Sequence, residues 1–416
     1  MTNNHPYRVD GAVGRIEFET HSASNRQGIE YDSAKMAFDP LKPKQLYLTS
    51  GFKELAIIMG DTDRSFRKTT KLINHVRYQE ENGTPLRTLH ENTNKEGAAL
   101  IEHLKKKAND INQDNFTADG ECINRAISRG EQPVTLPMEK IMEALETSST
   151  DYNPIEMLNN PVLFEDPNMA VNISIDDVTP KRQKDTRESP KVTQHDRKYV
   201  HDTVAHVESE RERYVLNGDS IKTTLWFLNA LLLSNSLFGK RLQIFTDGHK
   251  VLNDTILKFY RWYDNIQIIL DWYHLEKKCK EQLSMGMKGR DIRNATLEKL
   301  MPLLWHGLTD KAVAYLESID PSNIKAEFRI VKLIEYLKRN KPRIPNYELR
   351  KRLGLRNSSN IGEKMNDLLV SNRQKDNGMS WSKKGSLNLA TVTALKINNE
   401  YEKWFRDKEL AFRLVA

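Results

Sequence analysis

Two short apolar runs with a helical pattern between them stand near the middle of the chain. Residues 242–245 are followed by Thr246 and Asp247, and residues 266–270 are followed directly by Asp271. Between the runs, apolar residues from 251 to 263 fall mostly at helical spacing. This pattern predicts a strand, a helix and a second strand, with parallel strands buried on both faces. Functional groups collect at the carboxyl ends of such strands, so Asp247-Gly248 is a candidate site position.

Upstream segments predict the rest of a sheet. Residues 171–175 alternate between apolar and polar side chains and end in Asp176-Asp177, which is typical of a strand with one apolar face. Residues 199–215 predict one or two antiparallel strands, and residues 221–237 predict a buried helix. Residues 181–196 are charged without periodicity, and we expect a mobile loop there.

The pattern becomes helical after Asp271 and stays helical. We expect helices at 272–286, 294–306, 309–318, 323–340, 346–353 and 360–372, followed by an amphipathic helical tail at 387–414. The predicted fold class is therefore α/β, with an all-helical insertion after the sheet and before the last helices.

The N-terminal part is less regular. Residues 1–40 are polar, with weak alternation around 14–18, so a small β element and a flexible arm both remain open. Residues 41–150 are predicted to be mainly helical. Within them, 83–89 and 94–101 have the form of two short helices around a turn, as in a DNA-reading helix-turn-helix, although ordinary helical hairpins are commoner. We divide the chain into an irregular arm (1–40), a candidate DNA-binding region (41–150), the first part of a catalytic core (165–275), a basic helical insertion (276–355) and C-terminal core helices (356–416).

Composition narrows the class of protein. The 416 residues contain no run of 18 apolar residues, and the first residues lack an apolar signal core, so neither a membrane span nor a secretory signal is expected. The two cysteines, Cys122 and Cys279, lie far apart and cannot build a disulfide framework. These features favour a cytoplasmic protein.

Charge is concentrated in one segment. The chain has a net charge of +7 and a pI of about 9.0, which favours a polyanionic partner. Residues 325–356 alone contain 11 Lys and Arg against 3 Asp and Glu, a net charge of +8. A solvated helical face would also explain this excess.

Three acidic residues form a candidate constellation. Asp176 and Asp247 each end a predicted strand, and Glu363 lies in a predicted helix that opens with Asn360-Ile361-Gly362. Repulsion makes clustered carboxylates unfavourable unless cations bind them, and Mg²⁺ prefers oxygen ligands. Two such ions would support phosphodiester chemistry. Each acid also has a structural explanation, as a turn former, a helix cap or a solvated surface residue.

Four segments together resemble a known family. SIDDV, TDG, DWYHL and GEKMNDLLVSNRQKDNGMSWSKKG are similar to segments of bacterial insertion-sequence transposases of the DDE type. The last segment is the most specific, because Glu363 is followed by Arg373, Lys375 and the Gly-Met-x-Trp-Ser element at 378–382. The resemblance covers about residues 165–400. The usual Gly-Ser-Gly before the glutamate is replaced here by Ser358-Ser359-Asn360.

The resemblance implies an RNase H-like core interrupted by a helical insertion, which fits the separation of 116 positions between Asp247 and Glu363. It implies that Asp176, Asp247 and Glu363 bind two Mg²⁺ ions, with Mn²⁺ as a substitute. Water, and then the freed 3′-hydroxyl, would attack DNA phosphodiesters. Asp177 remains an alternative to Asp176 as the first ligand, and Asp271 with His274 is expected to support the core by capping and packing.

DNA contacts and partners follow as expectations. The partner would be double-stranded DNA, both terminal inverted repeats and target, bound by a homodimer or larger assembly. Trp381 would stack on DNA or pack in the core. Alternatives are a silent transposase-derived DNA-binding protein, an RNase H-like nuclease without strand transfer, and an α/β phosphohydrolase with an aspartate nucleophile. The predicted DNA-contacting residues are Arg373, Lys375, Trp381, Arg350, Lys351 and Arg352.

Overall fold

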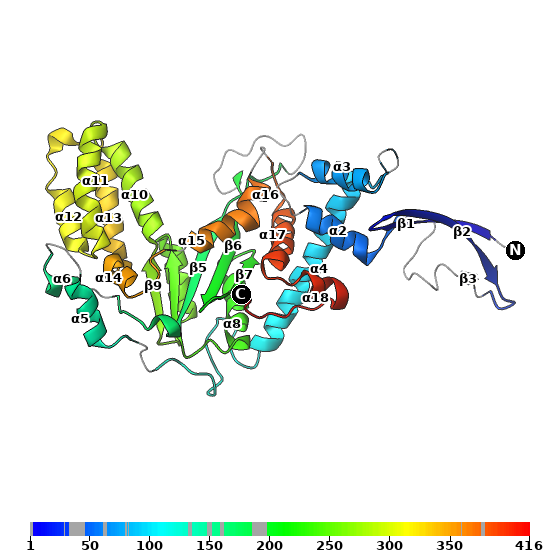
Figure 1. Cartoon of the computed structure of the whole chain (residues 1–416), viewed down its shortest axis with the longest axis horizontal. Coiled ribbons are helices and arrows are strands. Elements are labelled where there is room, and N and C mark those ends of the chain that lie inside the picture. The colour runs from blue at the N-terminus through cyan, green and yellow to red at the C-terminus, as the bar shows by residue number, and fades with distance from the viewer. Residues whose placement is uncertain are drawn as a thin grey trace. The chain divides into compact units, whose positions relative to one another are not determined.

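A computed structural model describes residues 3–28, 30–32, 46–60, 65–79, 81, 83–131, 135–147, 152–158, 162–184, 198–358, 360–375 and 379–416. It divides into two compact units. The first comprises 1–104, 180–200 and 369–411, and the second comprises 105–179, 201–368 and 412–416. Figure 1 labels their elements.

A five-stranded mixed sheet forms the centre of the second unit. Its order is β7-β6-β5-β8-β9. β5 is antiparallel to β6 and parallel to β8, β6 is antiparallel to β7, and β8 is parallel to β9. The strands are β5 (Ala170–Val178), β6 (Asp202–Ser209), β7 (Glu212–Gly218), β8 (Arg241–Thr246) and β9 (Ile266–Leu270).

Two helices connect these strands. α8 (Ile221–Ser234) is apolar, packs on β6 and β7, and is capped by Ser220, whose hydroxyl accepts from the backbone N–H of Thr223. α9 (Lys250–Phe259) joins β8 to β9 and contacts α8. The order β8, α9, β9 confirms the predicted strand–helix–strand unit. A covering helix of this kind buries the apolar strands.

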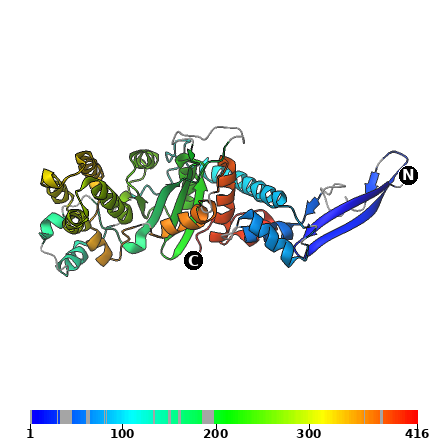
Figure 2. The ribbon, with the colours of Figure 1, turned by 90° about the horizontal axis from the view of Figure 1, so that it is seen from above.

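A helical insertion follows β9. Its helices lie side by side in both views (Figures 1 and 2) and pack around buried Leu283, Leu300 and Leu337. The prediction of an all-helical segment here is confirmed. The insertion contains α10 (Trp272–Gly286), α11 (Arg290–Trp305), α12 (Thr309–Glu317), η2 (Pro321–Asn323), α13 (Glu327–Asn340), η3 (Lys341–Arg343) and α14 (Tyr347–Arg352).

The second unit is completed by short elements. Val415 forms an antiparallel bridge with Arg213 of β7, which pairs part of that edge strand. The remaining elements are α5 (Met138–Glu146), α6 (Pro154–Leu158), η1 (Pro167–Met169) and α15 (Asn360–Asn366), and α15 continues as a π-helical turn, η4 (Asp367–Ser371).

The first unit joins an N-terminal sheet of order β3-β2-β1-β4 to helices. Its strands are β1 (Asn3–Gly11), β2 (Gly14–Ser24), β3 (Glu30–Asp32) and β4 (Leu46–Leu48). Its helices are α2 (Ser50–Gly60), α3 (Phe66–Val76), the first part of α4 (Leu86–Asn112), α16 (Asn372–Gln374), α17 (Lys383–Ile397) and α18 (Tyr401–Asp407).

Of the two alternatives left open for residues 1–40, the described residues form the small β element. β1 and β2 form a hairpin, with Tyr7 stacked on Phe18 at a centroid distance of 5.7 Å. Asp10 takes a polar position in the alternation Tyr7-Arg8-Val9-Asp10, yet it is buried, where it accepts hydrogen bonds from Arg15 and Thr84.

The predicted pair of short helices at 83–101 is wrong. α4 runs without a break from Leu86 to Asn112. Gly97 lies inside this helix, where a Cβ would come within 2.5 Å of the Asn388 carbonyl oxygen. Tertiary packing therefore explains this glycine. Most of the loop predicted at 181–196 lies outside the described residues.

Candidate active site

Strand register brings Asp176 and Asp247 to the same face and level of the sheet. Ser174 of β5 lies directly opposite Phe245 of the parallel strand β8. Asp176 lies two residues after Ser174, and Asp247 lies two residues after Phe245. A two-residue step returns to the same face of a strand. The carboxyl ends of two neighbouring strands therefore carry the two aspartates together.

Helix α15 packs against this edge. α15 contacts β5 and β6, and its Asn366 donates from Nδ2 to Oδ2 of Asp176 at 3.0 Å. Glu363 lies in the same helix three residues earlier, a spacing that puts two residues on one helical face. The side chain of Glu363 lies outside the described residues, so its placement rests on the backbone alone.

Electrostatics at Asp176 reflect a crowded acidic site. Burial raises the pKa of Asp176 to about 6, the nearby charge of His274 lowers it, and repulsion from Asp247 raises it. The backbone N–H of Asp177 also donates to Oδ1 of Asp176 at 2.8 Å. Burial is the largest cause of the raised pKa, and the charge of Asp247 adds to it.

Asp177 faces a different partner. Its Oδ1 accepts from the hydroxyl of Thr203 at 2.6 Å, and the residue is exposed. Alternation along β5 sends adjacent side chains to opposite faces, so Asp176 and Asp177 cannot both join Asp247. The geometry thus favours Asp176 between the two alternatives that the sequence left open.

The helical insertion contacts the segment that carries Asp247. Tyr336 of α13 donates its hydroxyl to the backbone carbonyl of Asp247 at 3.0 Å. Gly248 has a φ of +81°, and a Cβ there would lie 2.8 Å from Leu270 Cδ1 and 3.0 Å from the Tyr336 hydroxyl. Glycine is therefore required next to Asp247 by both backbone conformation and space.

Asp271 caps α10, as the structural interpretation predicted. It is 1% exposed and accepts from the backbone N–H groups of Tyr273 at 2.8 Å and His274 at 3.4 Å. The Nδ1 atom of His274 lies 3.7 Å from Oδ1 of Asp271. The influence of His274 on the pKa of Asp176 places a second titratable group beside the aspartate pair.

Arg350 belongs to the protein interior, which corrects its predicted role in DNA contact. Its side chain is 0% exposed and donates to both carboxylate oxygens of Glu165, at 3.2 and 3.0 Å. It also donates to Gln243 of β8 and to the backbone carbonyl of Arg356. A guanidinium this enclosed cannot reach DNA without leaving a buried carboxylate unpaired. Arg350 instead ties α14, β8 and the segment leading to α15 together.

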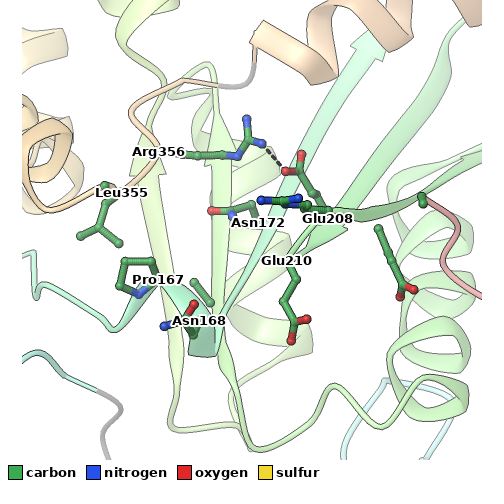
Figure 3. Close-up of a pocket in the computed structure, with 12 residues that line it drawn as sticks. Pro167, Asn168, Asn172, Glu208, Glu210, Leu355 and Arg356 are labelled. Carbon is green, nitrogen blue, oxygen red and sulfur yellow. Dashed lines mark hydrogen bonds and ion pairs between the residues drawn. The ribbon is translucent and has the colours of Figure 1, made fainter.

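A cavity of about 860 Å³ lies on the same sheet face, toward the amino end of β5. Figure 3 shows Arg356 pointing at Glu208 of β6, with which it forms an ion pair, beside Asn172 of β5. The lining combines Glu208, Glu210 and Glu212 with Arg211 and Arg356. It lacks the positive excess that phosphate groups would require. The ion pair instead fastens the segment before α15 to the sheet.

Two further predicted DNA contacts are buried in the first unit, and their predicted roles are corrected. Arg373 is 3% exposed, donates to the carbonyl of Gly60 at 3.0 Å, and lies over the rings of Phe66 and Trp381. Trp381 is 7% exposed and donates its indole N–H to the carbonyl of Gln374 at 3.0 Å. Both side chains pack in the core of that unit, the alternative already open for Trp381. Lys375 is exposed, and its role in DNA contact stays a prediction.

Several Lys and Arg side chains of the basic segment 325–356 form ion pairs with acidic residues of the same chain. Lys351 and Arg352 are exposed, although Arg352 also pairs with Glu348. The segment therefore presents less free positive charge than its composition indicates. The ion pairs are Lys338–Glu317, Lys341–Asp310, Arg350–Glu165, Arg352–Glu348 and Arg356–Glu208.

The donor set at the acidic edge suits a hard divalent cation. Asp176 and Asp247 offer carboxylate oxygens on one sheet face, and Mg²⁺ prefers few protein carboxylates with water or phosphate oxygens as its other ligands. Among the side chains that the structure describes, no group of three His, Cys, Asp or Glu could hold a metal ion. The third predicted carboxylate, that of Glu363, is not among them.

Sequence reasoning missed Asn366 and Tyr336. Asn366 follows Glu363 by three residues, a spacing that could have marked it as a same-face neighbour. Tyr336 carried no local signal, because its partner Asp247 lies 89 residues away. Asn366 contacts Asp176 from α15, and Tyr336 contacts the backbone of Asp247 from the helical insertion.

Comparison with known proteins adds little. No protein-family model and no curated protein matches the chain. Among solved structures, the Drosophila P element transposase strand transfer complex is similar with a TM-score of 0.27 and 10% identity, over 89% of this chain and 83% of that chain. A TM-score this low carries no argument about fold or function. No described helix is long and apolar enough to cross a membrane.

Proposed function

We propose that this chain is a DDE-type transposase that cleaves DNA and transfers the cut strand, using Asp176, Asp247 and Glu363 on an RNase H-like core. The five-stranded mixed sheet and the helical insertion between β9 and α15 support this proposal. Double-stranded DNA would be the substrate, and joining two DNA ends would require a dimer or a larger assembly.

One observation carries the proposal, the hydrogen bond from Asn366 to Asp176. It joins residues 190 positions apart and brings the helix of Glu363 to the edge where two aspartates meet. Asp247 also accepts from the backbone N–H of His249 at 2.7 Å, as a turn aspartate does, but a turn alone does not explain a Glu-bearing helix at this edge. This convergence supports a catalytic origin for the cluster, because repulsive carboxylates are otherwise unfavourable.

Each residue has a defined task in this mechanism. Asp176 and Asp247 would hold the metal ions, and Glu363 would complete the set from α15. Bound Mg²⁺ ions would supply activation of a hydroxyl nucleophile and stabilisation of the leaving oxygen. Asn366 would orient the Asp176 carboxylate, as partners behind a ligand commonly do. Tyr336 would fix the backbone of Asp247 through its carbonyl.

The test is cleavage of DNA carrying both ends of the genetic element that encodes the chain, with Mg²⁺ or with EDTA. Wild-type protein is compared with Asp176→Asn, Asp247→Asn and Glu363→Gln. The matched control is Asp177→Asn, one residue away on the opposite face. We expect nicking that requires Mg²⁺, persists in the control and falls by at least about 1,000-fold in the three variants, since each removes charge at the reacting centre.

Two other results would replace the proposal. DNA binding without nicking in every protein would identify a silent DNA-binding protein. Metal-dependent nicking without joining of the cut ends would identify a nuclease. Equal loss in Asp177→Asn and Asp176→Asn would remove the assignment of Asp176, and circular dichroism would check that each variant is folded.

A further inference from the structure

Another cavity, of about 360 Å³, lies in the second unit between α4, α8 and α9. Three lysines from three helices line it: Lys105, Lys222 and Lys258. Asp119 is the one acidic side chain in the lining. Lys222 and Lys258 form no ion pair with any described residue. The lining is therefore positive and suited to an anion.

Aromatic side chains form the rest of the wall. Trp226 and Phe227 come from α8, and Phe259 comes from α9. Trp226 is fixed in place, because its indole N–H donates to Asn109 of α4 at 2.8 Å and its carbonyl accepts from Asn112 at 2.8 Å. A fixed aromatic wall beside Lys222 and Lys258 matches the chemistry of single-stranded nucleic acid, whose bases stack and whose phosphates pair with cations.

One end of the cavity, at Lys222, lies at the end of the sheet where β5 and β8 end, on the face opposite Asp176, because α9 packs on the Thr246 side of β8 and contacts α8. Gly218, the last residue of β7, lies opposite Thr203 of β6, and Thr203 lies opposite Asp177 of β5. Lys222 follows in the first turn of α8. β5 and β7 are two strand spacings apart, roughly 10 Å. A DNA strand that leaves the aspartates and passes over this end of the sheet would therefore reach Lys222, on the other face, within a few nucleotides.

We propose that this cavity binds single-stranded DNA that flanks the cleavage site, with phosphates on Lys222 and Lys258 and a base against the aromatic wall. The choice of DNA as ligand rests on the proposed function. A single strand is favoured over a duplex because pairing hides the base faces that an aromatic wall would contact. A cavity of this size accommodates about one nucleotide at a time.

The test measures binding of a fluorescent 15-nucleotide oligo(dT) in EDTA, where no cleavage occurs. Lys222→Gln/Lys258→Gln is compared with wild type and with Lys106→Gln, a control on α4 next to Lys105 and outside the lining. We expect about tenfold weaker binding near physiological salt and a salt slope smaller by about 1.4, because single strands release about 0.7 counterions per contact. The control should match wild type.

Tryptophan emission gives a second readout. Oligo(dT) should quench wild-type emission more than emission of Trp226→Phe, because only wild type has the indole at this wall. Binding by the double variant that equals that of Lys106→Gln would overturn the inference. Equal sensitivity of a 15-base-pair duplex to the double substitution would overturn its single-strand part. Because EDTA removes cleavage from the assay, failure of the transposase proposal would be seen separately, in the nicking experiment.

Discussion

The amide of Asn366 and the carboxylate of Asp176 form a hydrogen bond of 3.0 Å between residues 190 positions apart. Burial raises the pKa of the Asp176 carboxyl that accepts this bond to about 6. The bond links the geometry of α15 to the orientation of the first aspartate. Removing this bond should therefore slow DNA cleavage more than it lowers the free energy of unfolding.

Asn366→Ala should slow Mg²⁺-dependent DNA cleavage by about 10- to 100-fold, since removing a partner that orients a metal ligand typically costs that much. The rate is measured at saturating DNA while Mg²⁺ is varied, and the Mg²⁺ requirement should rise. Lys364→Ala, an exposed position on the same helix, is the control. Equal rates for the two variants would mean that the hydrogen bond has no role in the reaction.

Asp176→Asn should stabilise the metal-free protein at high pH. The folded pKa of about 6 lies above the value of roughly 3.9 in an unfolded chain, so the folded state binds the proton more tightly between these values. Stability from the protonated carboxyl is present below pH 4 and is lost as pH rises through 6. An amide keeps the neutral form, so the variant should gain on the order of 1–3 kcal/mol at pH 8.

Urea unfolding at pH 4 and pH 8 measures this difference. The two proteins should be similar at pH 4 and diverge at pH 8. Added Mg²⁺ should raise the midpoint of wild type and leave that of Asp176→Asn almost unchanged, because binding to the folded state alone is stabilising. A wild-type protein that is the more stable of the two at pH 8 without metal contradicts the prediction.

Arg350→Met should destabilise the protein by about 3–5 kcal/mol, because it leaves Glu165 charged and buried without its partner. Glu165→Gln should also be destabilising, and the double variant should lose less than the sum of the two. Urea unfolding of the four proteins completes the cycle. Arg352→Met, two residues away at an exposed ion pair, should cost no more than about 1 kcal/mol. Additive effects at 165 and 350 would show that the pair is not coupled.

Gly248→Ala should reduce cleavage by up to about 100-fold, because a new methyl group displaces Tyr336 and shifts the backbone that carries Asp247. Gly354→Ala is the matched comparison. Gly354 also has a positive φ, +73°, but a Cβ there meets nothing within 4 Å. That variant carries only backbone strain, of about 1 kcal/mol, and should cleave DNA normally. Comparable losses in both would assign the effect to strain.

Short-range pattern predicted the sheet and the insertion well. Residues 171–175 and 242–245 have the alternating and continuous apolar patterns of half-buried and buried strands, and both form strands of one sheet. The helices after Asp271 show apolar periodicity along their own length. In these elements the burial that decides the structure is visible within ten residues.

Long-range pairing was not visible in the sequence. Arg350 was predicted to be a surface cation, but Glu165, 185 residues earlier, pairs with it in the interior. Asp10 has the sequence pattern of an exposed polar residue, but Arg15 and Arg77 pair with it in a buried position. Arg373 and Trp381 match the family pattern yet serve packing. Residue type sets what a side chain can do, while its distant partner decides which of these roles it has.

The separation between β9 and α15 has a consequence for synthesis. Every strand of the mixed sheet has been made once Leu270 leaves the ribosome, but α15 begins only at Asn360. At bacterial and eukaryotic elongation rates the intervening residues take roughly 5 to 20 s. Throughout that interval the nascent chain holds two aspartates without Asn366 or Glu363. If the proposed function holds, an unfinished polypeptide would be unable to cut DNA while it is still attached to its messenger.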